Sequence, residues 1–252
     1  MIDLHVHSTF SDGSYTPAQL VSMARRAGIS AVALTDHDTT DGLTAFLEAA
    51  RSAGADGSAS SGCEAIPGVE ISTSVPRGTM HVLGYFVDPH ETSFQRLLQR
   101  LRAGREERNA QILTKLGELG MPLSWEDVTR CAGDRVVGRP HFAQALVEAG
   151  YVKSRVKCFE KYLARGRPAY FERYRPSPEE AIRGIGAAGG VPVLAHPLTL
   201  DLRLGELRTY LGKLMGYGLA GIEAFYSEHN ADLERSFRRL AKELDLVATG
   251  GS

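Results

Sequence analysis

Two histidines stand two residues apart near the start of the chain. His5 and His7 belong to its first apolar run, and Asp12 follows in the loop behind them. In an extended strand, residues i and i+2 face the same side, so we expect the two imidazoles to point together while Leu4 and Val6 face the other way. Two parallel imidazoles can chelate one divalent cation, and the pair therefore predicts the beginning of a metal site.

Further imidazole and carboxylate groups occur at the ends of other strand-like runs. "ALTDHDTTDG" places His37 after the second run, "GVEIS" places Glu70 at the end of the third, and "VLAHPLT" places His196 at the end of the fifth. "MHVLGY" places His81 at the start of the fourth run, which makes it the weakest of these candidates. Five of the eight histidines occupy such positions, which favours a metal site over histidines that fill the core or face solvent.

The types of donor narrow the choice of ion. Imidazole and carboxylate without thiolate suit Zn, Mn or Fe better than Mg or Ca. The donors outnumber what one tetrahedral site requires, so we predict two or three divalent metal ions, with Glu70 as the bridge because a carboxylate has two oxygens. Metal pairs of this kind activate water and clamp the attacking and leaving oxygens of a phosphoryl transfer.

The candidate ligands are positioned by alternating strand and helix signals. Thr16-Pro17-Ala18-Gln19 is typical of a capped helix start, and Ser177-Pro178-Glu179-Glu180 repeats the pattern. The alternation predicts an α/β fold with a mostly parallel sheet, and seven strands favour a barrel whose strand ends share one mouth. The predicted strands are Ile2–Val6, Ala31–Thr35, Ile66–Ser72, Met80–Val87, Val191–Ala195, Gly221–Phe225 and Leu246–Thr249.

One segment interrupts this alternation with helical patterns. We predict a barrel formed by residues 1–93 and 166–252, and a helical insertion, or cap, formed by residues 94–165. Residues 96–175 contain 17 Lys/Arg and 9 Asp/Glu, whereas the rest of the chain contains 12 and 21. A basic insertion beside an acidic barrel suggests an anionic ligand such as phosphate or nucleic acid. Arg-rich solvated helices would explain the charge equally well.

Composition places the chain among soluble globular proteins. Its 43% hydrophobic and 23% charged residues are ordinary values, and no apolar run approaches the roughly 20 residues of a membrane helix. The three cysteines are odd in number and widely separated, which argues against a disulfide framework. We therefore predict a cytoplasmic protein with no membrane partner.

The ordered motifs resemble a known family. "DLHVHSTFSDG", "TDHDTTDG", "GVEIS" followed by "HVLGY", "AHP" and "TGGS" together resemble the PHP (polymerase and histidinol phosphatase) phosphoesterases over essentially the whole chain. The resemblance implies a distorted, TIM-like (β/α)7 barrel with up to three ions of Mn, Fe or Zn. It assigns His5, His7 and Glu70 to the first ion, Glu70, His81 and His196 to the second, and Asp12 and His37 to the third.

A narrower resemblance concerns the substrate. "GRPHFA" and "IEAFYSEHN" are most similar to stand-alone bacterial PHP phosphatases, which remove the 3′-phosphate of nucleoside 3′,5′-bisphosphates and in some cases trim short RNA from its 5′ end. The resemblance implies that Arg139 and His141 contact the substrate phosphate, and a guanidinium does offer phosphate a bidentate fork. His229 is expected near the mouth of the barrel as a further substrate-binding residue.

The sequence ends before one further family motif. In this family "GGS" is followed by an aspartate and then a histidine that both bind metal, whereas this chain stops at Ser252. We therefore expect its C-terminal end to be truncated relative to the natural protein.

Three alternatives to a nucleotide phosphatase stay open. The protein could be a 5′-3′ exonuclease that holds short single-stranded RNA or DNA on the basic insertion. It could instead act on a histidinol phosphate or sugar phosphate, because few aromatic residues are placed to stack on a base. As a non-enzymatic alternative, it could be a non-catalytic PHP module.

Overall fold

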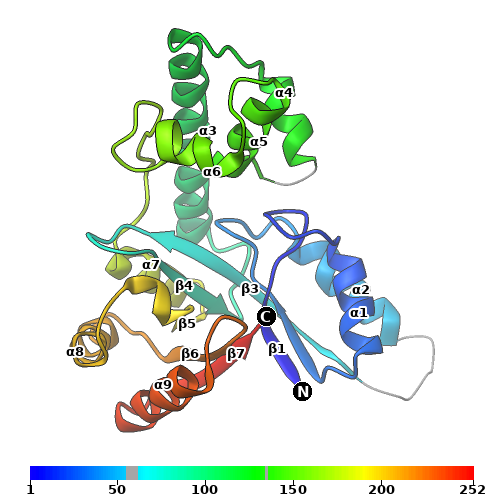
Figure 1. The fold of residues 1–252 in the computed structure, drawn as a ribbon. Helices are drawn as coiled ribbons and strands as arrows, with labels where there is room; N and C mark the ends of the chain where they lie inside the picture. The colour runs from blue at the N-terminus through cyan, green and yellow to red at the C-terminus, as the bar shows by residue number, and fades with distance from the viewer. Residues whose placement is uncertain (55–61, 134–135) are drawn as a thin grey trace. The chain divides into compact units, whose positions relative to one another are not determined.

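The computed structural model describes residues 1–54, 62–133 and 136–252. Its strands form one sheet in chain order, from β1 to β7 (Figure 1). β7 returns beside β1, where the backbone N–H of Ser252 donates to Asp3 at 3.1 Å, so the sheet curves into a nearly closed barrel as predicted. The strands are Ile2–Val6 (β1), Ala31–Leu34 (β2), Glu64–Thr73 (β3), Met80–Tyr85 (β4), Val191–Leu194 (β5), Gly221–Tyr226 (β6) and Val247–Gly251 (β7).

Helices cover the outer face of the barrel. Thr16 and Gln19 form the predicted capping box at the start of α1, and Ser177 accepts a hydrogen bond from the Glu180 N–H at the start of α7. Figure 1 shows α1 and α2 side by side, with α7 against β4 and β5 and α9 beside β6 and β7. The bounds are Pro17–Arg26 (α1), Leu43–Gly54 (α2), Pro178–Ala187 (α7), Leu204–Met215 (α8) and Ala231–Glu243 (α9), with a short 3₁₀ turn at Pro197–Leu200.

One strand of the barrel runs against its neighbours. β4 is antiparallel to both β3 and β5, whereas every other pairing between neighbouring strands is parallel. Residues 74–79 between β3 and β4 are too few to form a crossover helix, so the chain turns back as a hairpin. The start of β4 therefore lies at the same edge as the end of β3. The position of His81 at the start of its strand therefore does not argue against His81 as a metal ligand.

A β-bulge redirects side chains in β1. The register between β1 and β2 shifts between Asp3 and Val6, so that Leu4 and His5 stand opposite the single residue Ala33. The extra residue breaks the two-residue alternation of side chains. Leu4 consequently packs against the apolar interior of the barrel, and His5 is also buried. The expectation that Leu4 faces away from His5 is wrong for this reason.

Apolar side chains, most of them small or branched, and one tyrosine fill the barrel beneath its mouth. They alternate along β2 to β5 and so belong to the inner face of the sheet. Glu70 pairs in register with Leu83, a member of this cluster, and therefore also faces inward. The buried members are Ala31, Ala33, Ile66, Leu83, Tyr85, Val193 and Ala195.

The chain divides into two compact units, residues 1–99 with 175–252 and residues 100–174. The second unit begins and ends a few residues later in the chain than the predicted insertion, residues 94–165. The second unit has its own apolar core, which includes Ile112, Phe142 and Leu163. No helix within the described ranges is long and apolar enough to cross a bilayer. The remaining helices are Thr92–Glu118 (α3), Trp125–Ala132 (α4), Arg139–Glu148 (α5) and Arg155–Cys158 (α6), followed by a π-helical turn at Phe159–Leu163.

Candidate metal centre

The carboxylate of Glu70 faces five imidazoles, three of them through one oxygen. Glu70 Oε2 lies 3.2 Å from the Nε2 atoms of His5 and His7 and 3.0 Å from Nδ1 of His37. Within the described residues this buried oxygen has no hydrogen-bond partner, because the ring nitrogens approach it without donor geometry. A buried polar atom in that position calls for another partner. Nitrogen and oxygen donors converging on one point fit a divalent metal ion.

The other oxygen of Glu70 faces the remaining two imidazoles. Oε1 lies 2.8 Å from His81 Nδ1 and 3.0 Å from His196 Nε2, and these two ring nitrogens are 3.3 Å apart. The antiparallel course of β4 brings His81 to this position, and the end of β5 brings His196. Glu70 can thus offer one oxygen to each of two neighbouring ions.

Asp12 extends the cluster toward solvent. Its Oδ1 lies 3.5 Å from His7 Nδ1 and its Oδ2 lies 3.7 Å from His37 Nε2, and the side chain is 59% exposed. Together with the contacts of Glu70, this places all seven predicted ligands in one cluster. Three groups have ligand atoms within 4.8 Å of one another: His5, His7 and Glu70; His7, Asp12 and His37; and His37, Glu70 and His81.

A second buried carboxylate, Glu223 of β6, supports two of these ligands. Its Oε1 accepts a hydrogen bond from His5 Nδ1 at 2.9 Å, and its Oε2 accepts one from the backbone N–H of His196 at 2.7 Å. The first bond leaves Nε2 of His5 to face Glu70, as in carboxylate–histidine–metal arrangements. Sequence reasoning missed Glu223. Its position inside an apolar strand was the only signal that could have identified it.

The backbone of His196 is held in an unusual conformation. Its φ of 21° and ψ of 68° are rare for a residue with a side chain, and Pro197 follows directly. Thr199 accepts a hydrogen bond from His196 Nδ1 at 3.0 Å and donates one to the Thr79 carbonyl at 2.9 Å. The ring nitrogen that faces Glu70 is therefore Nε2, the one without a proton in this arrangement.

Two aspartates beside His37 hold the loops of the site. Asp36 accepts hydrogen bonds from the backbone N–H and the hydroxyl of Ser8 at 2.7 and 2.6 Å. Asp38 accepts one from the backbone N–H of Ser72 at 2.9 Å. Both carboxylates are buried. They fix the segments after β1 and β2 and the end of β3 relative to one another.

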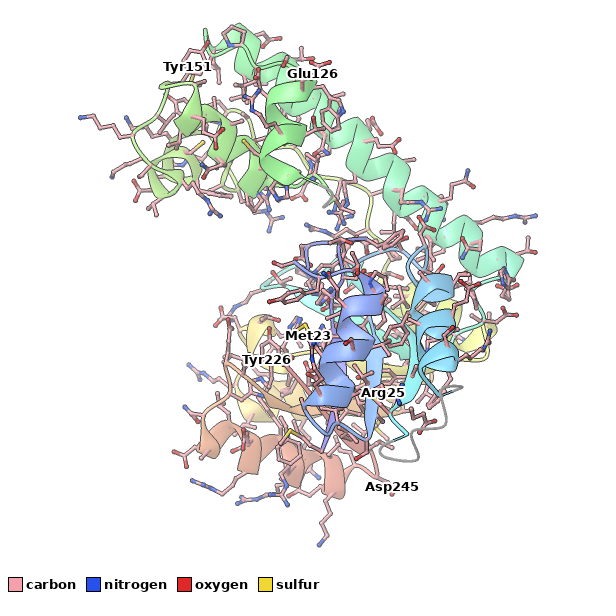
Figure 2. All side chains as sticks on the ribbon, turned by 90° about the vertical axis from the view of Figure 1, so that its right-hand side faces the viewer. Met23, Arg25, Glu126, Tyr151, Tyr226 and Asp245 are labelled. Carbon is pink, nitrogen blue, oxygen red and sulfur yellow. The ribbon has the colours of Figure 1, made fainter. Side chains whose placement is uncertain are left out.

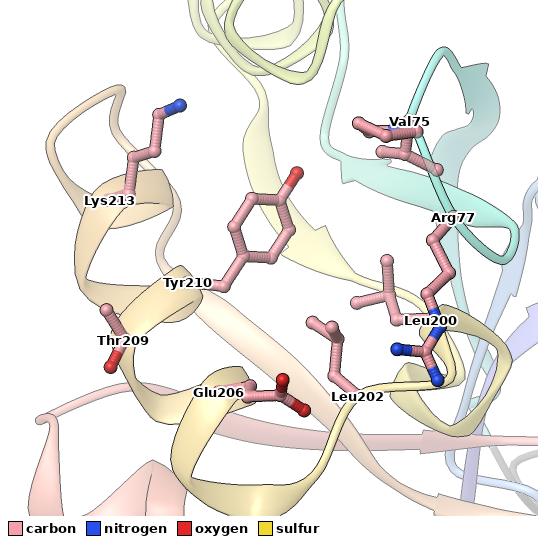
Figure 3. Close-up of a pocket in the computed structure, with 9 residues that line it drawn as sticks. Val75, Arg77, Leu200, Leu202, Glu206, Thr209, Tyr210 and Lys213 are labelled. Carbon is pink, nitrogen blue, oxygen red and sulfur yellow. The ribbon is translucent and has the colours of Figure 1, made fainter.

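A cavity of about 500 Å³ lies elsewhere in the first unit (Figure 3). The β3–β4 hairpin, the 3₁₀ turn and α8 line it mainly with apolar side chains, including Val75, Leu200 and Leu202. The Tyr210 hydroxyl donates to Met80 Sδ at 3.5 Å, next to His81. None of the seven candidate ligands lines this cavity.

The charges within the cluster stabilise one another. Burial alone would lower the pKa of His5, but the neighbouring Glu70 and Glu223 carboxylates raise it to about 10. Burial likewise opposes the charge on His37, yet Glu70 and Asp12 raise its pKa to about 9. Burial would raise the pKa of Glu70, but the surrounding imidazoles bring it well below the usual range.

An aromatic pair lies beside the cluster. The Tyr226 ring, labelled in Figure 2, is 5.5 Å from that of His196 and 6.1 Å from that of His5, and a bulge in β6 precedes it. His229 is buried behind Tyr226 and Phe237, with ring separations of 5.5 and 4.9 Å. Its Nδ1 donates to the Ala224 carbonyl at 3.1 Å. Its Nε2 is buried and has no hydrogen-bond partner among the described residues, and its role toward a substrate stays a prediction.

The two predicted phosphate-binding residues occupy the first turn of α5 in the second unit. Arg139 donates from Nη1 to the Leu163 carbonyl at 3.1 Å and lies over the Tyr170 ring at 4.9 Å. His141 Nδ1 accepts a hydrogen bond from the Gly138 N–H at 3.0 Å. A cation held at a helix N-terminus suits an anion. Their role toward a substrate stays a prediction.

The comparisons with known proteins agree with this geometry. The PHP domain profile matches residues 3–121. The chain is 36% identical over 252 residues to a 3′,5′-nucleoside bisphosphate phosphatase of Chromobacterium violaceum, covering 100% of this chain and 86% of that protein. This chain belongs to the PHP family. A 5′-3′ exoribonuclease of Haemophilus influenzae is 34% identical to this PHP protein, with 99% and 88% covered. A Bifidobacterium adolescentis structure assigned as a metal-dependent phosphoesterase superposes with a TM-score of 0.82 at 31% identity, with 99% and 86% covered.

We predict that Glu223→Gln weakens metal binding although Glu223 is not one of the predicted ligands. Glu223 uses a different oxygen for each of its two hydrogen bonds, to the His5 ring and to the His196 N–H. Glutamine replaces one of these oxygens with an NH2 group, which cannot accept a hydrogen bond. The affinity for Mn²⁺ or Co²⁺ in a titration should fall about 10- to 100-fold. Tyr85→Phe, which changes a hydroxyl in the same barrel interior, is the matched control. Equal affinities in wild type and Glu223→Gln would contradict the assignment.

We also predict that metal binding at neutral pH releases protons. With pKa values of about 10 and 9, the imidazoles of His5 and His37 are protonated on both nitrogens and positively charged at pH 7 in the metal-free protein. A metal ion binds only the neutral imidazole. Apparent affinity should therefore rise as pH increases toward those values. Calorimetry in two buffers of different protonation enthalpy should give different heats, and identical heats would refute the prediction.

Proposed function

We propose that this PHP protein is a metal-dependent phosphoesterase that hydrolyses a phosphate monoester of a small phosphorylated substrate. The favoured reaction removes the 3′-phosphate of a nucleoside 3′,5′-bisphosphate. The observation that carries the proposal is the Glu70 carboxylate, buried among five imidazoles with one oxygen lacking any hydrogen bond within the described residues. The reaction named for the Chromobacterium violaceum relative supports the choice of substrate.

The described residues would hold two or three divalent ions of Mn, Fe or Zn. His5, His7 and Glu70 would hold the first, Glu70, His81 and His196 the second, and Asp12 and His37 the third, for which His7 also lies close enough. Ions in such a site supply activation of water and neutralisation of the charge that develops on the phosphoryl oxygens. Glu223 and Thr199 keep the Nδ1 protons of His5 and His196 away from the cluster and orient both rings.

The predicted substrate contacts remain part of the proposal. Arg139 and His141 bind the phosphate from the start of α5, where a guanidinium offers two parallel donors. Tyr226 offers a ring beside His5 and His196 at the mouth of the barrel. The three free cysteines support a reducing location, and we place the protein in the cytoplasm.

A second candidate function is 5′-3′ exonucleolytic cleavage of short single-stranded nucleic acid. The excess of 17 Lys/Arg over 9 Asp/Glu in residues 96–175 favours it, because phosphodiester chains bind through their charge. The same metal centre would serve both reactions, since each attacks a phosphorus atom with water. The length of the preferred substrate distinguishes them.

The proposed function predicts phosphate release that depends on the metal ligands. Mn²⁺-loaded protein should release phosphate from a nucleoside 3′,5′-bisphosphate faster than from a mononucleotide or a sugar phosphate. His7→Ala removes a nitrogen that faces Glu70 Oε2 and should lower kcat/KM at least about 100-fold, with an unchanged circular dichroism spectrum.

His90→Ala is the matched control, because His90 is an exposed histidine of the same unit outside the cluster. It should retain wild-type activity. No phosphate release by the wild type from any of these substrates or from a short RNA would refute the enzymatic function.

Arg139→Ala should weaken phosphate recognition without emptying the metal centre. Loss of a charge-assisted bidentate contact should raise KM about 10-fold or more, with a smaller effect on kcat and unchanged metal content by elemental analysis. Arg130→Ala is a suitable control, since Arg130 is an exposed arginine of α4 that pairs with Asp127. An unchanged KM, or loss of metal, would refute the role of Arg139.

A further inference from the structure

Positive charge is concentrated in one stretch of the second unit. Residues 151–167 contain six cationic side chains and one acidic side chain, Glu160. The cationic residues are Lys153, Arg155, Lys157, Lys161, Arg165 and Arg167. None of them belongs to the predicted metal or phosphate-binding set, and the proposed function uses the charge of residues 96–175 only as a whole, without assigning it to particular side chains.

Three of these lysines line a pocket of about 450 Å³ together with two tyrosines. We call it the lysine–tyrosine pocket; its lining residues are Tyr151, Val152, Lys153, Lys157, Lys161 and Tyr162. Val152 and Tyr162 also pack against the apolar core of the unit and so form a firm floor. The lysines are exposed, which leaves their ammonium groups accessible.

The backbone here has an uncommon form. Ser154 caps α6 by accepting a hydrogen bond from the Lys157 N–H at 3.3 Å, and α6 passes directly into the π-helical turn that carries Lys161 and Tyr162. π-Helical turns are rare and often occur at functional sites. Lys157 and Lys161 are four residues apart and therefore lie on one side of this segment.

The three lysines of the pocket outnumber the one acidic side chain of residues 151–167, Glu160, which also interacts electrostatically with Lys161. Lys157 pairs with Glu160 at 2.6 Å, whereas Lys153 and Lys161 take part in no ion pair among the described residues. Tyr151, labelled in Figure 2, is 41% exposed and is fixed by its hydroxyl, which donates to the Pro122 carbonyl at 3.3 Å. The pocket thus combines accessible cations with an anchored aromatic ring.

We propose that the lysine–tyrosine pocket binds the backbone of single-stranded nucleic acid. Lys153, Lys157 and Lys161 contact successive phosphates, and the rings of Tyr151 and Tyr162 provide stacking surfaces for bases of any sequence. A membrane surface fits less well, because the one aliphatic side chain of the lining, Val152, belongs to the core of the unit. The inference rests on the proposed function in one respect: it takes the bound nucleic acid to be a substrate of the phosphoesterase.

The test measures binding without turnover. Full-length protein in EDTA is titrated against a 5′-fluorescein-labelled 12-nucleotide RNA, and anisotropy is followed at several salt concentrations. The combined variant Lys153→Ala, Lys157→Ala, Lys161→Ala should bind at least about 10-fold more weakly near 100 mM salt. Its slope of log K against log salt should be smaller in magnitude by about two, as expected for three lost phosphate contacts on a single strand.

A control variant removes the same charge elsewhere. Lys115→Ala, Arg130→Ala, Arg183→Ala changes one half-buried and two exposed cations that pair with acidic neighbours and should bind within about twofold of wild type. Lysine-to-arginine replacement at all three pocket positions should restore binding, which separates lost contacts from misfolding. Equal weakening in both alanine variants would overturn the proposal, as would wild-type binding to phosphatidylserine vesicles but not to RNA.

The two proposals fail separately. If wild type releases no phosphate from any substrate while the difference in RNA binding persists, the phosphoesterase function fails and the pocket stands. If phosphate is released but the pocket variant binds RNA like wild type, the pocket assignment fails and the phosphoesterase stands.

Discussion

The mouth of the barrel is organised around one buried charge. Glu70 carries a carboxylate deep in the protein, and an unpaired carboxylate in such a place is very costly. Five imidazoles converge on it within 3.2 Å, from β1 and the segment after it, the segment after β2, β4 and the segment after β5. Each element must therefore begin or end at a defined position, and a divalent ion held between these groups would satisfy both the carboxylate and the neutral rings.

Departures from regular barrel geometry serve this convergence. The bulge in β1 turns His5 inward together with its apolar neighbour, and the reversed direction of β4 brings His81 to the mouth. Glu223 then ties the His5 ring to the backbone of His196, across strands that are not neighbours in the sheet. The strained conformation of His196 is stable because these contacts leave it no alternative.

The sequence was sufficient to predict every strand and to name the seven candidate ligands that the structure brings into one cluster, because histidine and carboxylate residues at the ends of apolar runs are a strong pattern. It was insufficient for the direction of Leu4, since a bulge depends on register with a partner strand. His81 was judged the weakest candidate ligand on the assumption that β4 runs parallel to β3. The short connection between these two strands, residues 74–79, indicated an antiparallel hairpin instead. Glu223 was missed because one acidic residue in a buried strand resembles many others until its partners are known.

The hairpin also dictates when the centre can be completed during folding. Glu70 and His81 are separated by only 11 residues, whereas His81 and His196 are separated by 115 and His5 and Glu223 by 218. Short loops close at low entropic cost and early, and long ones late. The Glu70–His81 pair can therefore form as a local unit, while the remaining ligands arrive only with closure of the barrel. Full loading with metal is then a late event that stabilises the closed barrel, rather than the nucleus from which it grows.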